Sequence, residues 1–211
     1  MIGLKEFYNA FSRETRPIHY VGYVLGLIYL LFMNEIINMS NLFNIFVSIF
    51  IVFITAFIVI EHKNNSVQDA LVTTFGFFYV CFLLSHIYLI REYTYGEFFV
   101  WLVFISAWGC DTGAYFTGVA IGKHKLMPEL SPKKTIEGSI GGIILATLLA
   151  FLYGVYIQHI FRLEDVNTTL ICVLTGVIGS ILAQIGDLAA SAVKRHVGIK
   201  DYGNIIPGHG G

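Results

Sequence analysis

Four residues near the end of this 211-residue chain have the types and spacing to bind a metal-bound phosphate. If the apolar run before them continues as a helix, they occupy positions i, i+4, i+7 and i+8 of one helical face: Asp187, Ser191, Lys194 and Arg195. Carboxylate oxygens suit a hard cation such as Mg²⁺, and Lys and Arg suit phosphate oxygens. The alternative is an interfacial patch of salt bridges whose two cations snorkel to the membrane surface.

The residues that follow this face could shape a second wall or a lid. Lys200 and Asp201 come first, and His209 follows in the segment Pro-Gly-His-Gly. A histidine in such a position is, by itself, more typical of an ordinary surface residue. The segment therefore gains meaning only beside the charged face that precedes it.

A second basic cluster lies in the segment LSPKKTIEGSIGG, residues 130–142. The adjacent Lys133 and Lys134, the hydroxyls of Ser131 and Thr135, and the glycines could cradle a polyphosphate through charge and backbone N–H groups. Neither GxxxxGK[ST] nor GxGxxG occurs in the chain. A positively charged loop that binds lipid headgroups is the alternative, and charge alone does not distinguish the two.

Asp111 lies in the middle of an apolar run, with Tyr115 one helical turn later and glycines at 109, 113, 118 and 122. A carboxylate within a membrane span is costly and usually serves a function. The glycines indicate close helix packing, and a hydrogen bond from Asp111 to a neighbouring span is the structural alternative. We therefore predict a functional role for Asp111 and a packing role for the glycines.

Six apolar segments must position these residues. The chain is 56% hydrophobic and 13% charged, with a mean hydropathy of +0.72, whereas soluble domains are about 45–50% apolar and about 25% charged. A helix needs about 20 mostly apolar residues to cross a bilayer. The sequence therefore predicts an all-α, polytopic integral membrane protein with a single transmembrane domain and about six spans, at 18–38, 41–60, 69–90, 97–121, 139–160 and 169–192.

The basic residues orient these spans. Eleven of the thirteen Lys and Arg residues fall on the side that holds the N-terminal arm, the 122–138 segment and the tail. By the positive-inside rule that side is cytoplasmic. The net charge of −1 gives no reason to expect nucleic acid as a partner. The three cysteines lie in apolar runs without metal-type spacing, which indicates packing roles.

Three blocks of this sequence strongly resemble the phosphatidate cytidylyltransferase (CDP-diacylglycerol synthase) family. They are DTGAYFTG…GKHKL at 111–126, SPKKTIEGSIGG at 131–142, and SAVKRHVGIKDYGNIIPGHGG at 191–211, which GDL precedes. The last block corresponds to the family signature of S-x-x-K-R, then K-D, then P-G-H-G-G. The resemblance covers the chain from about residue 97 onward, and it makes 97–211 the expected catalytic portion.

The resemblance implies cytidylyl transfer from CTP to phosphatidate, giving CDP-diacylglycerol and pyrophosphate. It implies Mg²⁺, with room for a second metal ion, and it is compatible with a homodimer. The metal ligands would be Asp187 and Asp111. The catalytic set would be Asp187, Lys194, Arg195 and Asp201. The substrate-binding set would be Lys123, Ser131, Lys133, Lys134, Thr135, Ser191, Lys200 and His209. The expected location is the bacterial inner membrane, with the N-terminus and the active site cytoplasmic.

Two departures from the family pattern lead us to expect a chain truncated at both ends. Family members continue past His-Gly-Gly into an Asp-Arg-x-Asp segment, and they have further spans before the EFY segment that lies at residues 6–8 here. Three alternatives stay open. The protein could be a related CTP-dependent transferase acting on another membrane lipid, a cation transporter using Asp111 and Asp187, or an inactive fragment. A transporter would not need the two basic clusters, and the chain shows no repeated half.

Overall fold

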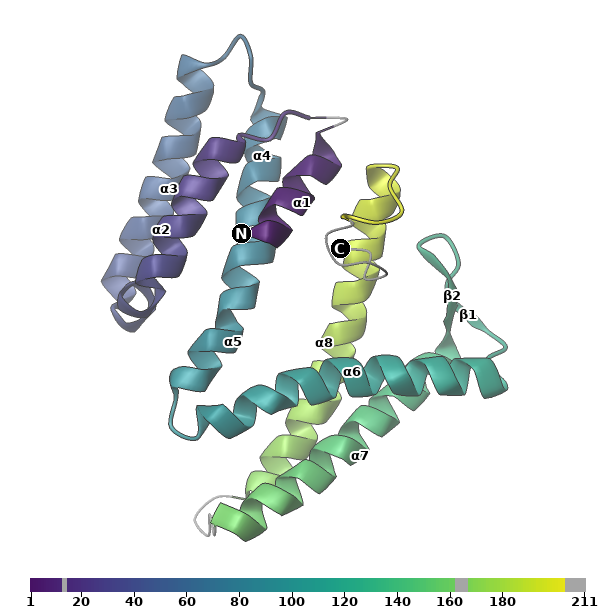
Figure 1. Cartoon of the computed structure of the whole chain (residues 1–211). Helices are drawn as coiled ribbons and strands as arrows, with labels where there is room; N and C mark the ends of the chain where they lie inside the picture. Colours follow the sequence, from purple (N-terminus) through teal and green to yellow (C-terminus); the bar gives the residue numbers. More distant parts are fainter. Residues whose placement is uncertain (13–14, 162–166, 204–211) are drawn as a thin grey trace. The chain divides into compact units, whose positions relative to one another are not determined.

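The computed structural model describes residues 1–12, 15–161 and 167–203 (Figure 1). The chain forms two compact units. We call residues 1–89 together with 194–211 the N-terminal unit, and residues 90–193 the central unit. Each unit is described by itself.

Six helices of the described residues are long and apolar enough to cross a membrane. They are α2 (His19–Asn38), α3 (Ser40–Ile60), the combined segment Val67–Glu92, α6 (Gly96–Ile121), α7 (Ile136–Phe161) and α8 (Thr168–His196). The predicted six-span, helical membrane protein is thereby confirmed. The third span is built from α4 (Val67–Gly76), a π-helical turn η1 (Phe77–Phe82) and α5 (Leu83–Glu92).

The N-terminal unit has an aromatic core. The rings of Phe50 and Phe77 lie 4.6 Å apart between centroids, and Tyr29 is fully buried with its hydroxyl 2.8 Å from that of Ser85. The amphipathic α1 (Ile2–Phe11) packs its buried face, which includes Leu4 and Phe7, within this unit. Rings in such tilted and edge-on pairs fill large volumes at favourable geometry.

A hydrogen-bond network connects α1 to α4. The Tyr8 hydroxyl donates to the Thr73 carbonyl (2.8 Å), and the Thr73 hydroxyl accepts from the Ile18 backbone N–H (2.7 Å). Burial, with smaller contributions from Cys81 and Tyr23, raises the pKa of the Tyr8 phenol well above its usual value. Tyr8 therefore stays a proton donor at physiological pH. Asp69 and Ser66 form a capping box at the first turn of α4.

The central unit is packed through small residues. A methyl group added at Gly113 on α6 would lie 2.8 Å from the Gly141 carbonyl oxygen of α7. A methyl group at Gly176 on α8 would lie 2.6 Å from the Cβ of Ala150. Glycines at such contacts let helix backbones approach closely, as is common in membrane proteins. The glycine stripe of α6 therefore has the packing role that the sequence predicted.

A β-hairpin lies between α6 and α7. Strand β1 (Lys125–Met127) pairs antiparallel with β2 (Ser131–Thr135), and Pro128 opens the turn between them. The Ile136 N–H donates to the His124 carbonyl (2.9 Å), which closes the base of the hairpin just before α7 begins. The lysines of this segment are therefore carried by a hairpin and not by the irregular loop that its polar composition suggests.

Candidate active site

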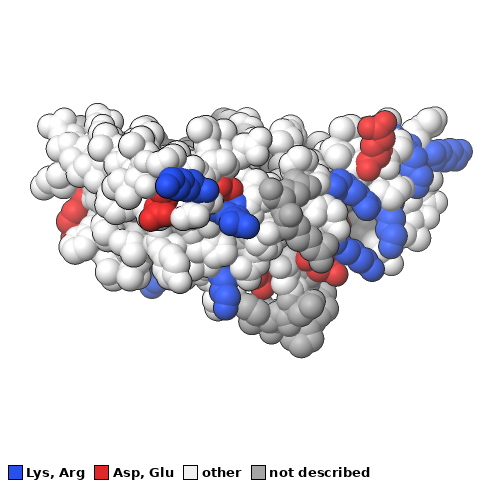
Figure 2. Space-filling model, turned by 90° about the horizontal axis from the view of Figure 1, so that it is seen from above, with Lys and Arg blue, Asp and Glu red and all other residues white. Residues whose placement is uncertain are grey.

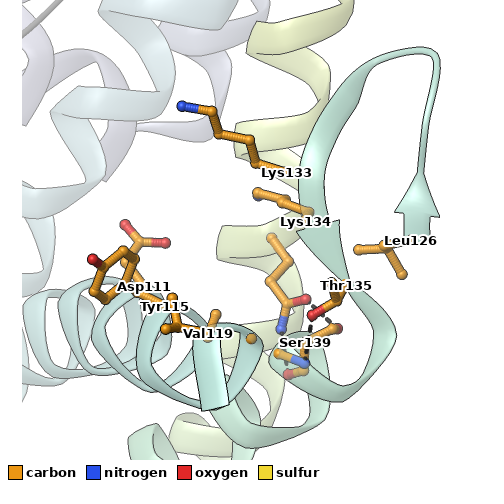
Figure 3. A pocket seen from close by; sticks show the side chains of 12 residues that line it. Asp111, Tyr115, Val119, Leu126, Lys133, Lys134, Thr135 and Ser139 are labelled. Carbon is orange, nitrogen blue, oxygen red and sulfur yellow. Dashed lines mark hydrogen bonds between the residues drawn. The ribbon is translucent and has the colours of Figure 1, made fainter. Parts of the chain in front are cut away.

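A cavity of about 330 Å³ opens in the central unit where the hairpin meets the helices (Figure 3). It is bounded by the second half of α6, by the hairpin, by the first turn of α7 and by α8. Its lining residues are Asp111, Ala114, Tyr115, Gly118, Val119, Leu126, Lys133, Lys134, Thr135, Gly138, Ser139 and Gln184.

Charged groups of opposite sign meet at this cavity. Lys134 on β2 forms an ion pair with Asp187 on α8, and the Asp187 side chain is 51% exposed. Asp111 on α6 lines the same cavity as Lys134. In Figure 3 the side chains of Lys133 and Lys134 extend from β2 toward the side on which Asp111 lies. Asp111 and two ammonium groups therefore line one hollow, and a second carboxylate, that of Asp187, adjoins it through its ion pair with Lys134.

Polar contacts between α7 and α8 hold the floor of the cavity. The Ser139 hydroxyl on α7 hydrogen-bonds the Gln184 side-chain oxygen on α8. The Gln184 side-chain N–H group also donates to the Ser139 carbonyl (3.2 Å) and to the Cys110 sulfur on α6 (3.3 Å). Gln184 therefore connects the three helices, and its position fixes the turn of α8 that carries Asp187.

A second set of contacts fixes the hairpin on α7. The Glu137 carboxylate accepts from the backbone N–H groups of Lys123 (3.1 Å) and His124 (3.2 Å), and it lies 2.6 Å from the His124 ring nitrogen. The Thr135 hydroxyl accepts from the Gly138 N–H (3.1 Å). These contacts hold both ends of the hairpin at the start of α7, so the direction of its lysine side chains is constrained.

This arrangement can bind a phosphorylated ligand. Ammonium groups of Lys attract phosphate oxygens, and nearby carboxylates supply ligands for a cation that bridges phosphates. The comparison with known proteins bears on which ligand this is. The cytidylyltransferase family profile matches residues 1–211, which is the whole chain.

The chain belongs to the cytidylyltransferase family. A phosphatidate cytidylyltransferase of Bacillus subtilis is 44% identical over 117 residues, which are 56% of this chain and 41% of that protein. One of Staphylococcus saprophyticus is 32% identical over 213 residues, covering 100% of this chain and 78% of that protein. One of Staphylococcus haemolyticus is 37% identical, covering 74% and 57% respectively. The matched segments thus span from less than half to about four fifths of these relatives.

The cavity of this family member contains several residues that the sequence singled out. Asp111, Lys133, Lys134 and Thr135 line it, and Asp187 is joined to it through its ion pair with Lys134. These residues come from three separate sequence blocks. Their assignment as metal ligands or substrate-binding groups stays a prediction.

Other predicted residues lie elsewhere in the central unit. Lys123 follows the end of α6 with an exposed side chain, Ser131 begins β2, and Ser191 lies on α8 one turn after Asp187, both half-buried. None of the three belongs to the described cavity lining.

The remaining predicted residues belong to the N-terminal unit or lie beyond the described residues. Lys194 places its ammonium group 5.8 Å from the centre of the Tyr202 ring, a cation–π contact. Arg195, Lys200 and Asp201 are exposed. His209 lies outside the described residues.

Sequence reasoning missed Gln184, Ser139 and the pair His124–Glu137. Gln184 lies three residues before Asp187, so it falls on the same side of α8. A polar amide within an apolar run is a signal that could have identified Gln184 as a site residue. Glu137 is the only acidic residue in the first turn of α7. Its contact with the backbone of residues 123 and 124 could not be read from spacing, because it depends on the hairpin.

The carboxylates fit a magnesium ion by their chemistry. Mg²⁺ in nucleotide sites is commonly held by one or two carboxylates, with substrate phosphates and water completing its shell. Asp111 lines the cavity, and Asp187 adjoins it through its ion pair with Lys134, so two such groups are available. Within the part of the chain that the structure describes, no group of three or more His, Cys, Asp or Glu side chains is placed to hold a metal. A metal here would therefore depend on ligands from the substrate.

Exposed lysines gather on the hairpin that borders the cavity. In Figure 2, Lys and Arg gather over the hairpin at the right of the view. Lys123, Lys125 and Lys133 are exposed there. Clustered positive charge raises the local concentration of anionic substrates and speeds their association.

Proposed function

We propose that this family member transfers the cytidylyl group of CTP to phosphatidate, which yields CDP-diacylglycerol and pyrophosphate. One observation carries the proposal: Asp111, Lys133 and Lys134 line one cavity, and Asp187 pairs with Lys134 at it. The names of the relatives point in the same direction. The catalytic portion is the segment from about residue 97 onward.

The reaction requires positioning and charge neutralisation. A phosphate oxygen of phosphatidate attacks the α-phosphorus of CTP, a new P–O bond forms, and the bond to the bridging oxygen breaks as pyrophosphate leaves with the electron pair. Lys133 and Lys134 would hold phosphate oxygens and stabilise the charge on them. Substrate phosphates would replace Asp187 as the partner of Lys134, or share Lys134 with it.

Asp187 and Asp111 would hold Mg²⁺, and a second metal ion would need substrate oxygens as further ligands. When bound, such a metal neutralises phosphate charge and stabilises the leaving pyrophosphate. Ser131, Thr135, Ser191, Lys123 and the tail residues keep the substrate-binding or catalytic roles that their family motifs predict.

The protein is an integral membrane protein, and we infer the bacterial inner membrane with the cavity on the cytoplasmic side. The basic split of the sequence supports this orientation, and CTP is a cytosolic nucleotide. Membrane lipids would surround the helices. A homodimer is compatible with this assignment.

The test is synthesis of CDP-diacylglycerol by the full chain in liposomes that contain phosphatidate, with labelled CTP and Mg²⁺. Lys134→Ala removes the cation that faces both carboxylates, so we expect kcat/KM to fall about 100-fold. The matched control is Lys125→Ala on the same hairpin, whose side chain is exposed and outside the cavity lining. Its kcat/KM should fall by no more than about 3-fold, because the variant removes one of several surface charges that attract anionic substrates and no group that lines the cavity.

Equal activities of the two lysine variants would contradict the assignment of this cavity. Product from an isoprenoid alcohol in place of phosphatidate would identify a related lipid transferase. Cation flux through the liposomes without any CTP-dependent product would identify a transporter instead.

A further inference from the structure

An apolar groove of about 640 Å³ lies in the central unit beside the polar cavity. Helix α6 lines it with residues between Phe99 and Ala107, and α8 lines it with residues between Ile171 and Ala183. Ser106 and Thr175 are its hydroxyl residues, and the Ser106 hydroxyl is directed at the Thr175 carbonyl (3.5 Å). The lining is therefore almost entirely apolar.

Small residues keep the groove hollow where the two helices come closest. A methyl group added at Gly179 would lie 2.6 Å from the Ser106 hydroxyl oxygen. Ala107 and Ala183 flank this contact on the two helices. Larger side chains, such as those of Phe99 and Ile171, line the more distant part.

The groove and the polar cavity use the same two helices. Ala107 in the groove lies one helical turn before Asp111 in the cavity, and Ala183 in the groove immediately precedes Gln184 in the cavity. A ligand with a phosphate in the cavity could therefore reach the groove with its next segment.

The distance from Asp111 to the far end of the groove is close to the length of one lipid tail. Phe99 lies twelve positions before Asp111 on α6, which is about 18 Å at 1.5 Å per residue. One leaflet of the hydrocarbon core is about 15 Å thick, half of the whole core. A ligand anchored by its phosphate at Asp111 and Lys134 would place an acyl chain along this part of α6.

We propose that one acyl chain of the phosphatidate substrate lies in the α6–α8 groove while its phosphate lies in the polar cavity. This inference rests on the proposed function. Lipid tails are as apolar as the groove, so binding there adds little affinity over the bilayer. Its effect is to hold the lipid phosphate in one orientation for attack on the nucleotide.

Photochemical labelling tests this placement without relying on turnover. The probe is phosphatidate with a diazirine at the end of one acyl chain, added to the full chain in liposomes. We expect the label on peptides covering residues 99–107 of α6 or 171–183 of α8. Excess unlabelled phosphatidate should suppress this labelling, and phosphatidylcholine should not. Lys134→Ala should also lower it, because the phosphate anchor is weakened.

A pair of matched variants sharpens the result. Val103→Phe fills the groove, whereas Val155→Phe adds the same group on α7 at a side chain that is 45% exposed and outside the groove lining. Because the added ring occupies space that the acyl chain needs, we expect labelling to fall about 5-fold in Val103→Phe and to stay unchanged in Val155→Phe. Mapping of the unaltered protein needs no variant, so the test survives if Val103→Phe fails to fold.

The outcomes separate the two proposals. If CDP-diacylglycerol forms but the label spreads over the lipid-facing helices, or if phosphatidylcholine competes equally, the groove assignment is overturned and the activity stands. If the label reaches the groove but no CTP-dependent product forms, the activity is overturned and the groove is supported as a site for phosphatidate.

Discussion

Asp69 in the N-terminal unit and Asp187 in the central unit are both carboxylates on membrane-spanning segments, yet they have opposite surroundings. Asp69 is 5% exposed, and its oxygens accept from the backbone N–H groups of Arg16 (2.6 Å) and Ser66 (2.6 Å). Asp187 is half-exposed and is paired with the side chain of Lys134. The first carboxylate is used up by the fold, whereas the second keeps oxygen lone pairs for a ligand.

The same contrast holds for packing. Large rings such as Phe50, Phe77 and Tyr29 fill the N-terminal unit. In the central unit, Gly113 and Gly176 bring backbones together. Close backbone approach holds the helices of the central unit at fixed distances, and a binding cavity needs that precision more than an aromatic core does.

The largest expected effect comes from replacing the two aspartates in turn. Asp187→Asn should lower the rate of CDP-diacylglycerol synthesis about 100-fold or more, because a charge that faces the reacting phosphates is lost. It should change the free energy of unfolding by at most about 1 kcal/mol, because the ion pair is partly solvated. The two measurements are labelled-CTP turnover and thermal unfolding in detergent.

Asp69→Asn should show the reverse. The Asn side chain has one oxygen that can accept and one nitrogen that cannot, so one of the two backbone N–H groups loses its acceptor. We therefore expect a loss of about 1–3 kcal/mol in the free energy of unfolding. Turnover per folded molecule should stay near that of the unaltered protein. A stable but inactive Asp69→Asn would break the distinction between a structural and a functional carboxylate.

The glycines offer a second comparison, with a smaller effect. Gly113→Ala places a methyl group 2.8 Å from the Gly141 carbonyl oxygen and 3.0 Å from the Gly142 Cα, so α6 and α7 must separate. Overpacking of this kind costs about 1–3 kcal/mol, and it should appear as a lower unfolding temperature. The matched control is Gly186→Ala on α8, where a methyl group meets nothing within 4 Å.

Gly186→Ala should be neutral or slightly stabilising, because Ala is the better helix former by about 1 kcal/mol. Equal unfolding temperatures for the two alanine variants would mean that α6 and α7 adjust freely. In that case the cavity beside them would not be held by close packing.

The sequence predicted the helices well because the bilayer fixes their length and composition. Each of the six spans was located within a few residues of its helix, since apolar runs of about 20 residues have few other interpretations. Asp111, Lys133 and Lys134 were singled out for the same reason: charge beside apolar runs is costly and therefore informative.

The partners of these residues could not be predicted in the same way. Helical spacing placed Asp187 on a face with Ser191 and Lys194, whereas the structure pairs it with Lys134 of β2. The hairpin itself was missed because its strands are short and the segment SPKKT is mostly polar, without the alternation that marks a half-buried strand. Contacts between distant segments depend on the tertiary fold, which spacing alone does not encode.

The smallest expected effect tests the hydrogen-bond network of the N-terminal unit. Tyr8→Phe removes the hydroxyl that donates to the Thr73 carbonyl (2.8 Å) and leaves the ring, which is fully buried, in place. We expect a loss of about 1 kcal/mol in the free energy of unfolding, the usual net value of one hydrogen bond. The measurement is thermal unfolding in detergent, with CDP-diacylglycerol synthesis measured on the same samples. Because Tyr8 belongs to the unit in which polar groups serve the fold, turnover should be unchanged. A variant of normal stability with reduced turnover would instead assign the N-terminal unit a direct part in the reaction.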